Sequence, residues 1–338
     1  MTLTRFSKQP VLAPEPGHDW EDLVVTNPAA FHDEKTGKVY LLYRAAGKDP
    51  RYIVHLGLAE SSDGYHFTRS SDRPVLSPLD GFVDGGGVED PRLVKFGEWY
   101  YLTYACRPFV NGQYWLKPSE RKFRFIPDPS LPEPLCSNGM NTAIAFSKDL
   151  RNWIRAGFIT EPGHEDHDVI LFPEKIHNRF YYLHRPVFGT EIPGIWLADT
   201  DNPLRLRNSR KLAFPVRDWE AQKIGANAPP IKTDKGWLVI YHGLGSDDYY
   251  RLGALLLDLE KPDTVIARTE EPIFEPEEWY ELAGCHSYKG VVFPCGNVVI
   301  NGELLVYYGA ADKYIGIAHC NLEQLLNEMI QHPGIAHE

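Results

Sequence analysis

The sequence predicts an all-β protein, folded as a single five-bladed β-propeller. One pattern of paired strands recurs five times along the chain, with shorter strand candidates between the copies. Only residues 321–330 have the apolar spacing of an amphipathic helix, and Asn321 is its candidate N-cap. Five repeats without an intervening linker favour a propeller over a β-sandwich with coincidental repeats.

Each copy of the pattern begins with a Pro-containing segment and a short apolar strand. A turn rich in Gly, Asn or Asp follows, and then an aromatic-rich strand that ends in a polar residue, which is typical of a β-hairpin. The copies are residues 27–45, 89–105, 171–186, 227–243 and 291–312, with prolines at 28, 91, 173, 229 and 294. Further strands are expected within 53–69, 140–155 and 194–207, which gives about four strands per blade.

The whole chain, 1–338, is expected to form one domain. The interval between Pro91 and Pro173 is the longest between successive copies, and it contains a stretch rich in Pro, Arg and Lys at 106–138. We interpret this stretch as an irregular insertion and a candidate lid. Its Tyr114 and Trp115, together with Tyr249, are candidates for stacking on a sugar. An insertion of this length could also cap a neighbouring copy, so a homo-oligomer is one expectation.

Composition narrows the range of partners. The formal net charge is −11, which argues against nucleic acid or an anionic membrane as the main partner. The five cysteines, Cys106, Cys136, Cys285, Cys295 and Cys320, form no CxxC pair and fit free thiols in a reducing compartment. Residues 1–20 lack the apolar stretch of a secretion signal, and no window reaches the ~18 apolar residues of a membrane span. The cytoplasm is therefore the expected location.

Polar residues recur at the ends of the repeated hairpins, where packing alone would favour apolar ones. The inner strands of a propeller converge on a central channel, so such ends are expected to line a shared pocket. Taken singly, each residue has an ordinary interpretation; Asp90, for instance, precedes a proline and suits a turn. Their recurrence indicates a site. The residues are Asn27, Arg44, Glu89, Asp90, His167, Asp168, His184, Arg185, Lys223, Asn227, His242 and Asp312.

The mixture of side chains favours an anion over a metal. No HxH or HExxH pattern is present, and the Lys and Arg residues of the set would repel a cation. The sequence also lacks GxSxG, P-loop and GxGxxG elements, so neither a metal nor an organic cofactor is expected. A cationic cluster of His167, Arg185 and His242 beside a carboxylate instead suits an anion held next to a general acid.

These residues lie in motifs that resemble glycoside hydrolase family 130, the β-mannoside phosphorylases and related mannosidases. The resemblance runs in order from about residue 20 to 320 and implies a five-bladed propeller. The matching stretches are NPAAF…YLLYRA, GLAESSDGYHF, GGVEDPRLV, LFPEKI…LHRP, KIGANAPPIKT…GWLVIYHG, YRLGALLLDLEKP and VYYGAADKYIGIA.

The resemblance implies a role for each matched residue. Asp90 corresponds to the general acid, which in this family is thought to act through a sugar hydroxyl. His167 stands where a further basic phosphate ligand, Arg or Lys, is usual, and this departure weakens the match to a phosphate site. The other implied phosphate ligands are Arg185, His242 and Tyr250. The residues expected to bind the sugar are Asn27, Arg44, Glu89, Lys223 and Asp312.

The expected reaction is reversible phosphorolysis of a β-mannoside with inversion, giving α-mannose 1-phosphate, with inorganic phosphate as co-substrate and no other cofactor. The substrate would be a β-1,2- or β-1,4-linked manno-oligosaccharide or a mannosyl-glucose. An inverting β-mannosidase is the alternative; it needs a second carboxylate as base, for which Glu89, Asp168 and Asp312 are candidates. A non-catalytic glycan-binding propeller is the third hypothesis.

Overall fold

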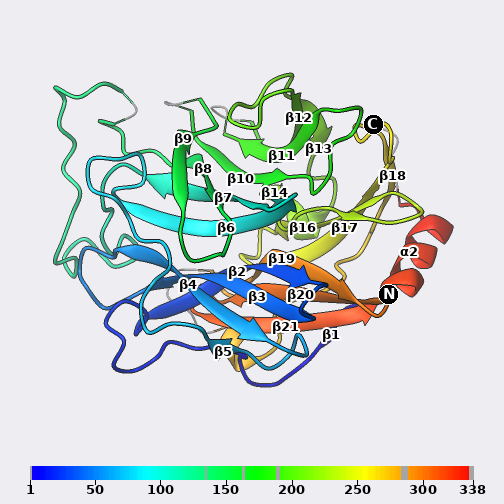
Figure 1. Ribbon diagram of the computed structural model, residues 1–338, viewed down its shortest axis with the longest axis horizontal. Coiled ribbons are helices and arrows are strands. Elements are labelled where there is room, and N and C mark those ends of the chain that lie inside the picture. The colour runs from blue at the N-terminus through cyan, green and yellow to red at the C-terminus, as the bar shows by residue number, and fades with distance from the viewer. Residues whose placement is uncertain (1, 134, 162–163, 188–190, 283–287, 335–338) are drawn as a thin grey trace.

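The computed structural model describes residues 2–133, 135–161, 164–187, 191–282 and 288–334. Within them, five antiparallel sheets surround a common centre, which confirms the predicted five-bladed propeller (Figure 1). The first strand of each repeat lies innermost, and the inner strands of blades five and one, one and two, two and three, and three and four contact one another.

Four blades are formed by consecutive strands, with the following bounds. Blade one has β2 (Val24–Asp33), β3 (Lys38–Ala46), β4 (Val54–Ser61) and β5 (Thr68–Arg69). Blade two has β6 (Gly87–Phe96), β7 (Trp99–Arg107), β8 (Asn141–Ser147) and β9 (Ile154–Phe158). Blade three has β10 (Asp166–Leu171), β11 (Phe180–Pro186), β12 (Ile195–Thr200) and β13 (Arg210–Ala213). Blade four has β14 (Lys223–Ala226), β15 (Ile231–Lys232), β16 (Trp237–Leu244), β17 (Tyr250–Leu257) and β18 (Val265–Arg268).

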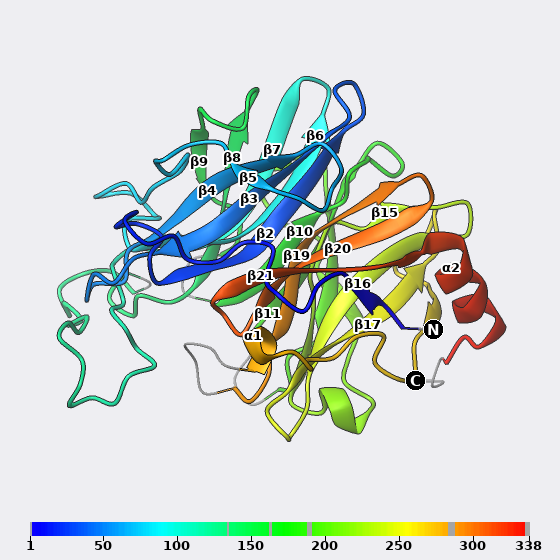
Figure 2. The same ribbon diagram turned by 90° about the horizontal axis from the view of Figure 1, so that it is seen from below.

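Blade five joins the two ends of the chain. It contains β19 (Val292–Ile300), β20 (Glu303–Ala310) and β21 (Tyr314–Asn321), and its outermost strand is β1 (Thr4–Arg5). Thr4 pairs with His319 and Arg5 with Ala318, so the N-terminal segment closes the propeller (Figure 2).

Helical structure is sparse and lies outside the blades. Where the apolar spacing predicts a helix over 321–330, the structure has α2 (Leu322–Gln331), and the Asn321 side chain accepts a hydrogen bond from the Gln324 N–H at 2.9 Å. The 3₁₀ turn η1 (Asp218–Glu220) and α1 (Trp279–Leu282) are too short to produce a periodic signal in the sequence. None of the helices in the described ranges has the length and apolar character needed to cross a membrane.

The third sequence repeat was placed too late in the chain. Its inner strand was expected after residue 171, whereas β10 ends there and Pro173 lies in the following turn. The outer strand expected within 194–207 is likewise wrong, since β13 begins at Arg210. Proline marks the inner strand in blades one and two, where Pro28 and Pro91 lie inside β2 and β6, but blade three has no proline at that position.

Five apolar clusters hold the blades together, one between each pair of neighbours. The cluster between blades three and four, for example, joins Leu183 and Leu197 to Trp237 and Leu255. Because strands alternate their faces, each inner and middle strand supplies side chains to the clusters on both sides. Burial of these side chains is the main stabilising contribution to the ring.

A repeated polar unit, here called the tyrosine pin, ties the edge of a blade to its middle. A carboxylate before the inner strand accepts a hydrogen bond from a buried tyrosine of the middle strand and pairs with an arginine on the outermost strand. The four pins are Glu21–Tyr43–Arg69, Asp84–Tyr104–Arg155, Glu220–Tyr241–Arg268 and Glu281–Tyr308–Arg5. In blade three the middle strand has His184 at this position, directly before Arg185.

The pin of blade five offers a matched test of its contribution to stability. Arg5 pairs with Glu281, whose side chain is 0% exposed, and with Glu277, whose side chain is 68% exposed. Glu281→Ala leaves Arg5 and Tyr308 without their buried partner and is expected to lower the free energy of unfolding by about 3–5 kcal/mol. Glu277→Ala is expected to cost less than about 1 kcal/mol. Urea denaturation of both variants checks this; equal losses would contradict a role for the pin in closing the ring.

Candidate active site

A bulge in the inner strand of the first three blades turns a polar side chain toward the centre. The strand registers shift at Asn27 in β2, at Asp90 in β6 and at Asp168 in β10. These residues have φ values of 46°, 47° and 52°. Asn and Asp tolerate this left-handed conformation better than other residues with a side chain, and a bulge redirects side chains. The local sequence therefore places three polar groups, one per blade, on one cavity.

The central cavity has a volume of about 520 Å³. Most of the predicted site residues line it, namely Asn27, Arg44, Glu89, Asp90, His167, Arg185, Tyr250 and Asp312. Asp168, Arg107, Met140, Tyr288, Val291 and Phe293 complete the wall with Tyr114 and Trp115. His242 and Lys223 are absent from this lining.

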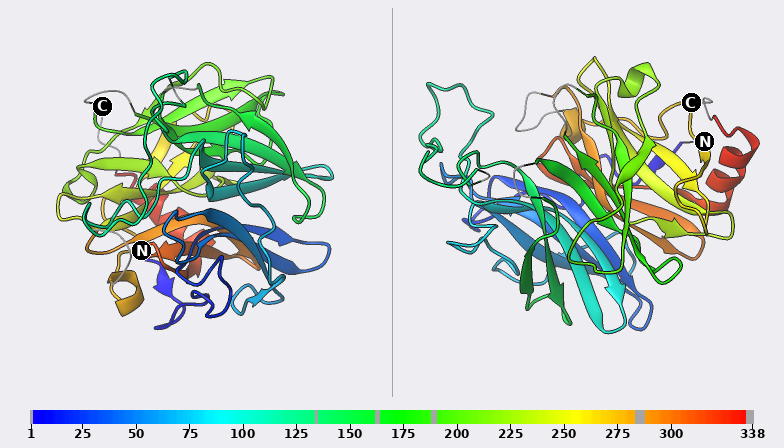
Figure 3. Two further views of the ribbon diagram at one scale, coloured as in Figure 1. Left: turned by 90° about the vertical axis from the view of Figure 1, so that its left-hand side faces the viewer. Right: turned by 90° about the horizontal axis from the view of Figure 1, so that it is seen from above.

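The segment between β7 and β8, which contains the predicted insertion, reaches the cavity from one side. Its loop stands away from the sheets at the left of Figure 1 and again in the right-hand view of Figure 3. Arg107 donates to the Asn138 carbonyl at 2.9 Å, which ties the end of the loop to β7. Trp115 packs edge-on against Tyr52 with ring centroids 4.5 Å apart. Tyr249 lies elsewhere, with its ring against Arg251.

Asp90 is held by one of its two carboxylate oxygens. Oδ1 accepts a hydrogen bond from the Asn27 amide at 2.7 Å and pairs with Arg44 at 3.0 Å. Oδ2 has no hydrogen bond to any residue in the described ranges. Arg44 also pairs with Glu89 at 2.9 Å, so this guanidinium bridges two carboxylates. The arrangement fixes the orientation of Asp90 and leaves one oxygen available to a bound molecule.

Asp168 anchors the cationic side of the cavity. Arg185 Nε donates to Oδ2 at 2.6 Å, and Arg92 Nη2 donates to Oδ1 at 3.1 Å. Burial alone would raise the pKa of Asp168, but the charges of Arg185 and Arg92 hold it well below its ordinary value. Burial also opposes the charge on Arg185, and Asp168 nevertheless raises the pKa of that guanidinium. Arg185 is therefore a fixed cation that lines the cavity.

Arg92 links this cationic side to Asp90. Its Nη1 donates to the Asp90 carbonyl at 2.5 Å, and its Nε donates to the Asn227 carbonyl at 3.1 Å. Sequence reasoning gave Arg92 no role, although it is the last residue of the EDPR motif. Tyr288 was also missed, because no repeat covers the segment in which it lies.

Tyr250 lines the cavity, whereas Lys223 lies beside it and outside the lining. Lys223 Nζ lies 5.2 Å from the centre of the Tyr250 ring and 6.0 Å from that of Tyr288. Burial, and then the nearby charge of Arg185, lowers the pKa of Lys223 to about 8. Burial raises the pKa of Tyr250 well above its ordinary value, so the phenol keeps its proton and can donate it in a hydrogen bond.

The two predicted histidines occupy different environments. His167 lines the cavity, with Nε2 3.5 Å from Glu165; this interaction lowers the pKa of Glu165 to about 2. His242 is 0% exposed, and burial lowers its pKa well below the ordinary value. Its Nδ1 contacts the Asn227 side chain at 3.1 Å, and its Nε2 lacks a hydrogen-bond partner in the described structure. His242 Nε2 lies 3.9 Å from Asp168 Oδ2, and the imidazole is not part of the cavity lining.

The described residues contain no group of three or more His, Cys, Asp or Glu side chains placed to hold a metal ion. A carboxylate with an available oxygen thus lines the same cavity as a fixed guanidinium, and aromatic rings edge that cavity. Such a site can hold a sugar beside an anion and supply a proton between them. A five-bladed propeller with this site belongs to the class of carbohydrate-active enzymes.

Comparison with known proteins identifies the family. A family model described as beta-1,4-mannooligosaccharide phosphorylase matches residues 5–121 and 136–331. The chain is 37% identical over 329 residues to the 1,2-beta-oligomannan phosphorylase of Thermoanaerobacter sp. (strain X514), covering 96% of this chain and 98% of that protein. The chain therefore belongs to glycoside hydrolase family 130.

Two solved structures are also similar. A beta-1,2-mannobiose phosphorylase from Listeria innocua, in complex with beta-1,2-mannobiose, aligns with a TM-score of 0.79 and 25% identity, covering 97% of this chain and 99% of the other. The second comes from work on glycoside hydrolases within family 130 that target beta-1,2 mannosidic linkages in Candida mannan. It aligns with a TM-score of 0.74 and 25% identity, covering 95% of this chain and 94% of the other.

Gly225 of β14 provides a test of the Asp168–Arg185 arrangement. A Cβ atom at this position would collide with Asp168 Oδ2 and lie 2.8 Å from Arg185 Nε. Gly225→Ala is therefore expected to displace the guanidinium and to lower the affinity for an anion in the cavity at least ~10-fold. Isothermal titration with inorganic phosphate measures this. Gly139→Ala, where a Cβ would make only ordinary contacts at 3.6 Å and beyond, is the control. Equal affinity in Gly225→Ala and the unaltered protein would contradict the account.

Proposed function

We propose that the protein is an inverting phosphorylase that cleaves a β-1,2-linked manno-oligosaccharide with inorganic phosphate and releases α-mannose 1-phosphate. The observation that carries the proposal is the pairing of Asp90, with one available oxygen, and the fixed cation Arg185 on the wall of one cavity. Membership of family 130 supports the same reaction class.

Asp90 is the proposed proton donor. Asn27 and Arg44 hold Oδ1, so Oδ2 faces the departing sugar and supplies the proton directly or through a sugar hydroxyl. The bond between the anomeric carbon and the departing oxygen breaks as phosphate attacks the anomeric carbon from the opposite face. Inversion at that carbon converts the β-mannoside to the α-phosphate. Glu89 and Asp312 are proposed to bind sugar hydroxyl groups beside it.

Arg185 is the proposed main phosphate ligand. A guanidinium presents paired N–H donors that match phosphate oxygens, and the Nε contact with Asp168 leaves its terminal nitrogens available. His167 and the Tyr250 hydroxyl are the proposed further donors, and Lys223 adds positive charge close to them. His242 is proposed to join them once phosphate has displaced part of the Asp168–Arg185 pair.

Hydrolysis requires a carboxylate that can take a proton from water. Asp168 is poorly suited, because two arginines hold its pKa well below the ordinary range and a good general base has a pKa nearer the working pH. Glu89 is engaged by Arg44. Because the family also contains hydrolases, the test below distinguishes phosphorolysis from hydrolysis. A non-catalytic glycan-binding propeller is the other alternative.

The proposed β-1,2 linkage of the substrate is based on the names of similar phosphorylases. The compared phosphorylases from Thermoanaerobacter and Listeria are named for β-1,2-linked substrates. Tyr114 and Trp115 are proposed to contact the departing sugar; both line the cavity from the loop between β7 and β8. Cys106, Cys136, Cys295 and Cys320 are free thiols, which supports the proposed cytoplasmic location; Cys285 lies outside the described residues.

The reaction is tested by incubating the protein with β-1,2-mannobiose, with and without phosphate. Mannose 1-phosphate is expected only with phosphate, and Asp90→Asn is expected to lower kcat at least ~10²-fold with little change in sugar binding, because it removes the proton but keeps the shape. Asp80→Asn, an exposed aspartate, is the control. Equal release of free mannose without phosphate would establish hydrolysis instead, and undiminished turnover in Asp90→Asn would remove its role.

The pH dependence tests Lys223. Its ammonium is charged below the pKa of about 8 and loses that charge as the pH rises through this value. We therefore expect kcat/KM for phosphate to fall above about pH 8. Lys223→Arg keeps its charge and is expected to flatten this decline, whereas the exposed Lys211→Arg is expected to leave it unchanged. Identical profiles for Lys223→Arg and the unaltered protein would show that Lys223 does not assist phosphate binding.

A further inference from the structure

Blade three lacks the tyrosine pin that the other four blades contain. His184 replaces the tyrosine, and its partners are Asp166 and Ser209. In blades one, four and five a glycine faces the tyrosine across the sheet and leaves room for its ring; the residue that faces His184 is Trp196. The replacement therefore involves several positions of blade three rather than a single substitution.

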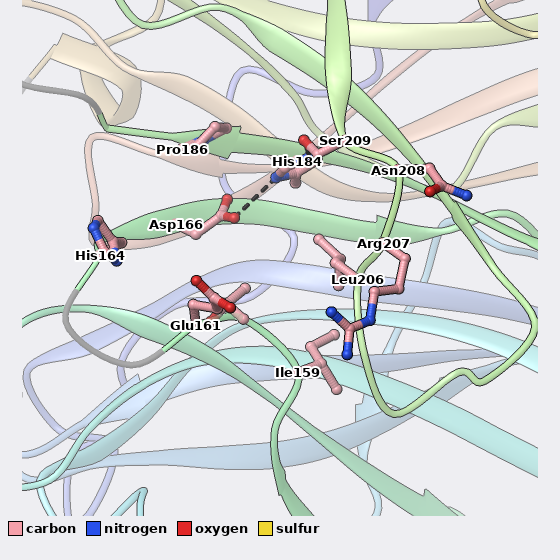
Figure 4. Close-up of a pocket in the computed structure, with 11 residues that line it drawn as sticks. Ile159, Glu161, His164, Asp166, His184, Pro186, Leu206, Arg207, Asn208 and Ser209 are labelled. Carbon is pink, nitrogen blue, oxygen red and sulfur yellow. Dashed lines mark hydrogen bonds and ion pairs between the residues drawn. The ribbon is translucent and has the colours of Figure 1, made fainter.

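The three side chains form a directed hydrogen-bond relay. Asp166 Oδ2 lies 2.8 Å from His184 Nδ1, and Ser209 Oγ lies 2.7 Å from His184 Nε2 (Figure 4). A carboxylate accepts, so Nδ1 carries the proton and Nε2 is left to accept from the serine hydroxyl. This is the order of groups by which a serine hydroxyl is activated as a nucleophile in unrelated folds.

The relay opens into a cavity of its own. This cavity has a volume of about 340 Å³ and lies between the end of blade two and the loop that precedes β13. Ile159, Leu206 and Pro186 provide apolar walls, and Ser209 is exposed. Adjacent residues of a strand face opposite ways, so His184 faces this cavity while Arg185 lines the central one. The two sites are thus separated by the sheet of blade three.

Arg207 supplies a positive charge at the same cavity. Its guanidinium extends between Leu206 and Ile159 in Figure 4 and makes no hydrogen bond or ion pair within the described part of the chain.

The contacts of Asp166 differ from those of a purely structural pin. In blade four, both oxygens of Glu220 have partners: Oε1 accepts from Arg268 and from the Val216 N–H, and Oε2 accepts from Tyr241. Asp166 is only 8% exposed, yet its Oδ1 has no hydrogen-bond partner among the described residues. A buried carboxylate oxygen without a partner is costly and is more often found where a group has a chemical task.

We propose that Ser209, His184 and Asp166 form a second active site, which hydrolyses carboxylic esters with a short acyl chain. Ser209 Oγ attacks the ester carbonyl, and its proton passes to His184 Nε2. The alcohol leaves with that proton, and the acyl group remains on Ser209. A water molecule, deprotonated by His184, then cleaves the acyl-serine to the free acid and restores the hydroxyl. Asp166 orients the imidazole and stabilises its charged form.

The test uses the full chain with 4-nitrophenyl acetate and 4-nitrophenyl butyrate. Ser209→Ala is expected to lower kcat/KM for both esters at least ~100-fold, since the members of such a relay act as a unit. Ser246→Ala, an exposed serine in a different cavity, is the control and is expected to retain the full rate. Thermal unfolding of each variant confirms that it is folded. Equal ester hydrolysis by Ser209→Ala and the unaltered protein would overturn the proposal.

A second measurement needs no variant. The unaltered protein is treated with a fluorophosphonate, which reacts with activated serines, and its peptides are analysed by mass spectrometry. An adduct on Ser209 is the expected result. An intact protein without an adduct, or labelling confined to other serines, would show that the three residues only tie the loop before β13 to β11.

Discussion

The bulge in the inner strands of the first three blades is the constraint on which the site depends. A regular strand would alternate its side chains between the two neighbouring apolar clusters, and no polar group would be directed to the axis. The left-handed residue at the bulge breaks this alternation, and Asn27, Asp90 and Asp168 occupy it because Asn and Asp tolerate that conformation. The apolar clusters and the tyrosine pins hold the blades in fixed positions. The bulges then direct one polar side chain from each of three blades into one cavity.

Asp168 connects the charged groups of the cavity through two arginines. It is buried and binds Arg185 and Arg92, and Arg92 in turn reaches the backbone of Asp90. The cavity therefore presents a fixed cation, Arg185, together with a carboxylate, Asp90, that Asn27 and Arg44 orient. This pair of groups suits a reaction in which an anion attacks a sugar carbon and a proton is delivered to the departing group.

Much of the fold could be predicted from the sequence, because the five repeats indicate five blades, and Pro28 and Pro91 mark the inner strands of the first two. Blade three was misplaced, since Pro173 lies in a turn and Asp168 marks its bulge instead. Asn27, Arg44 and Asp90 were predicted from their positions at the ends of the repeated hairpins, and all three line the central cavity. The face of the sheet to which each residue of an adjacent pair points was harder to predict. His184 and Arg185 were assigned to one site, yet they face different cavities. Burial of His242 and the anchoring role of Asp168 depend on contacts between strands far apart in sequence, which no local pattern reveals.

The most direct test of the central claim is ³¹P NMR of the reaction of β-1,2-mannobiose with inorganic phosphate. The account predicts that the phosphate signal is converted to that of α-mannose 1-phosphate, with one phosphate consumed for each glycosidic bond broken. Inversion is predicted because phosphate is proposed to attack the anomeric carbon from the face opposite the departing sugar. Release of free mannose with no change in the phosphate signal, or formation of the β-phosphate, would contradict it.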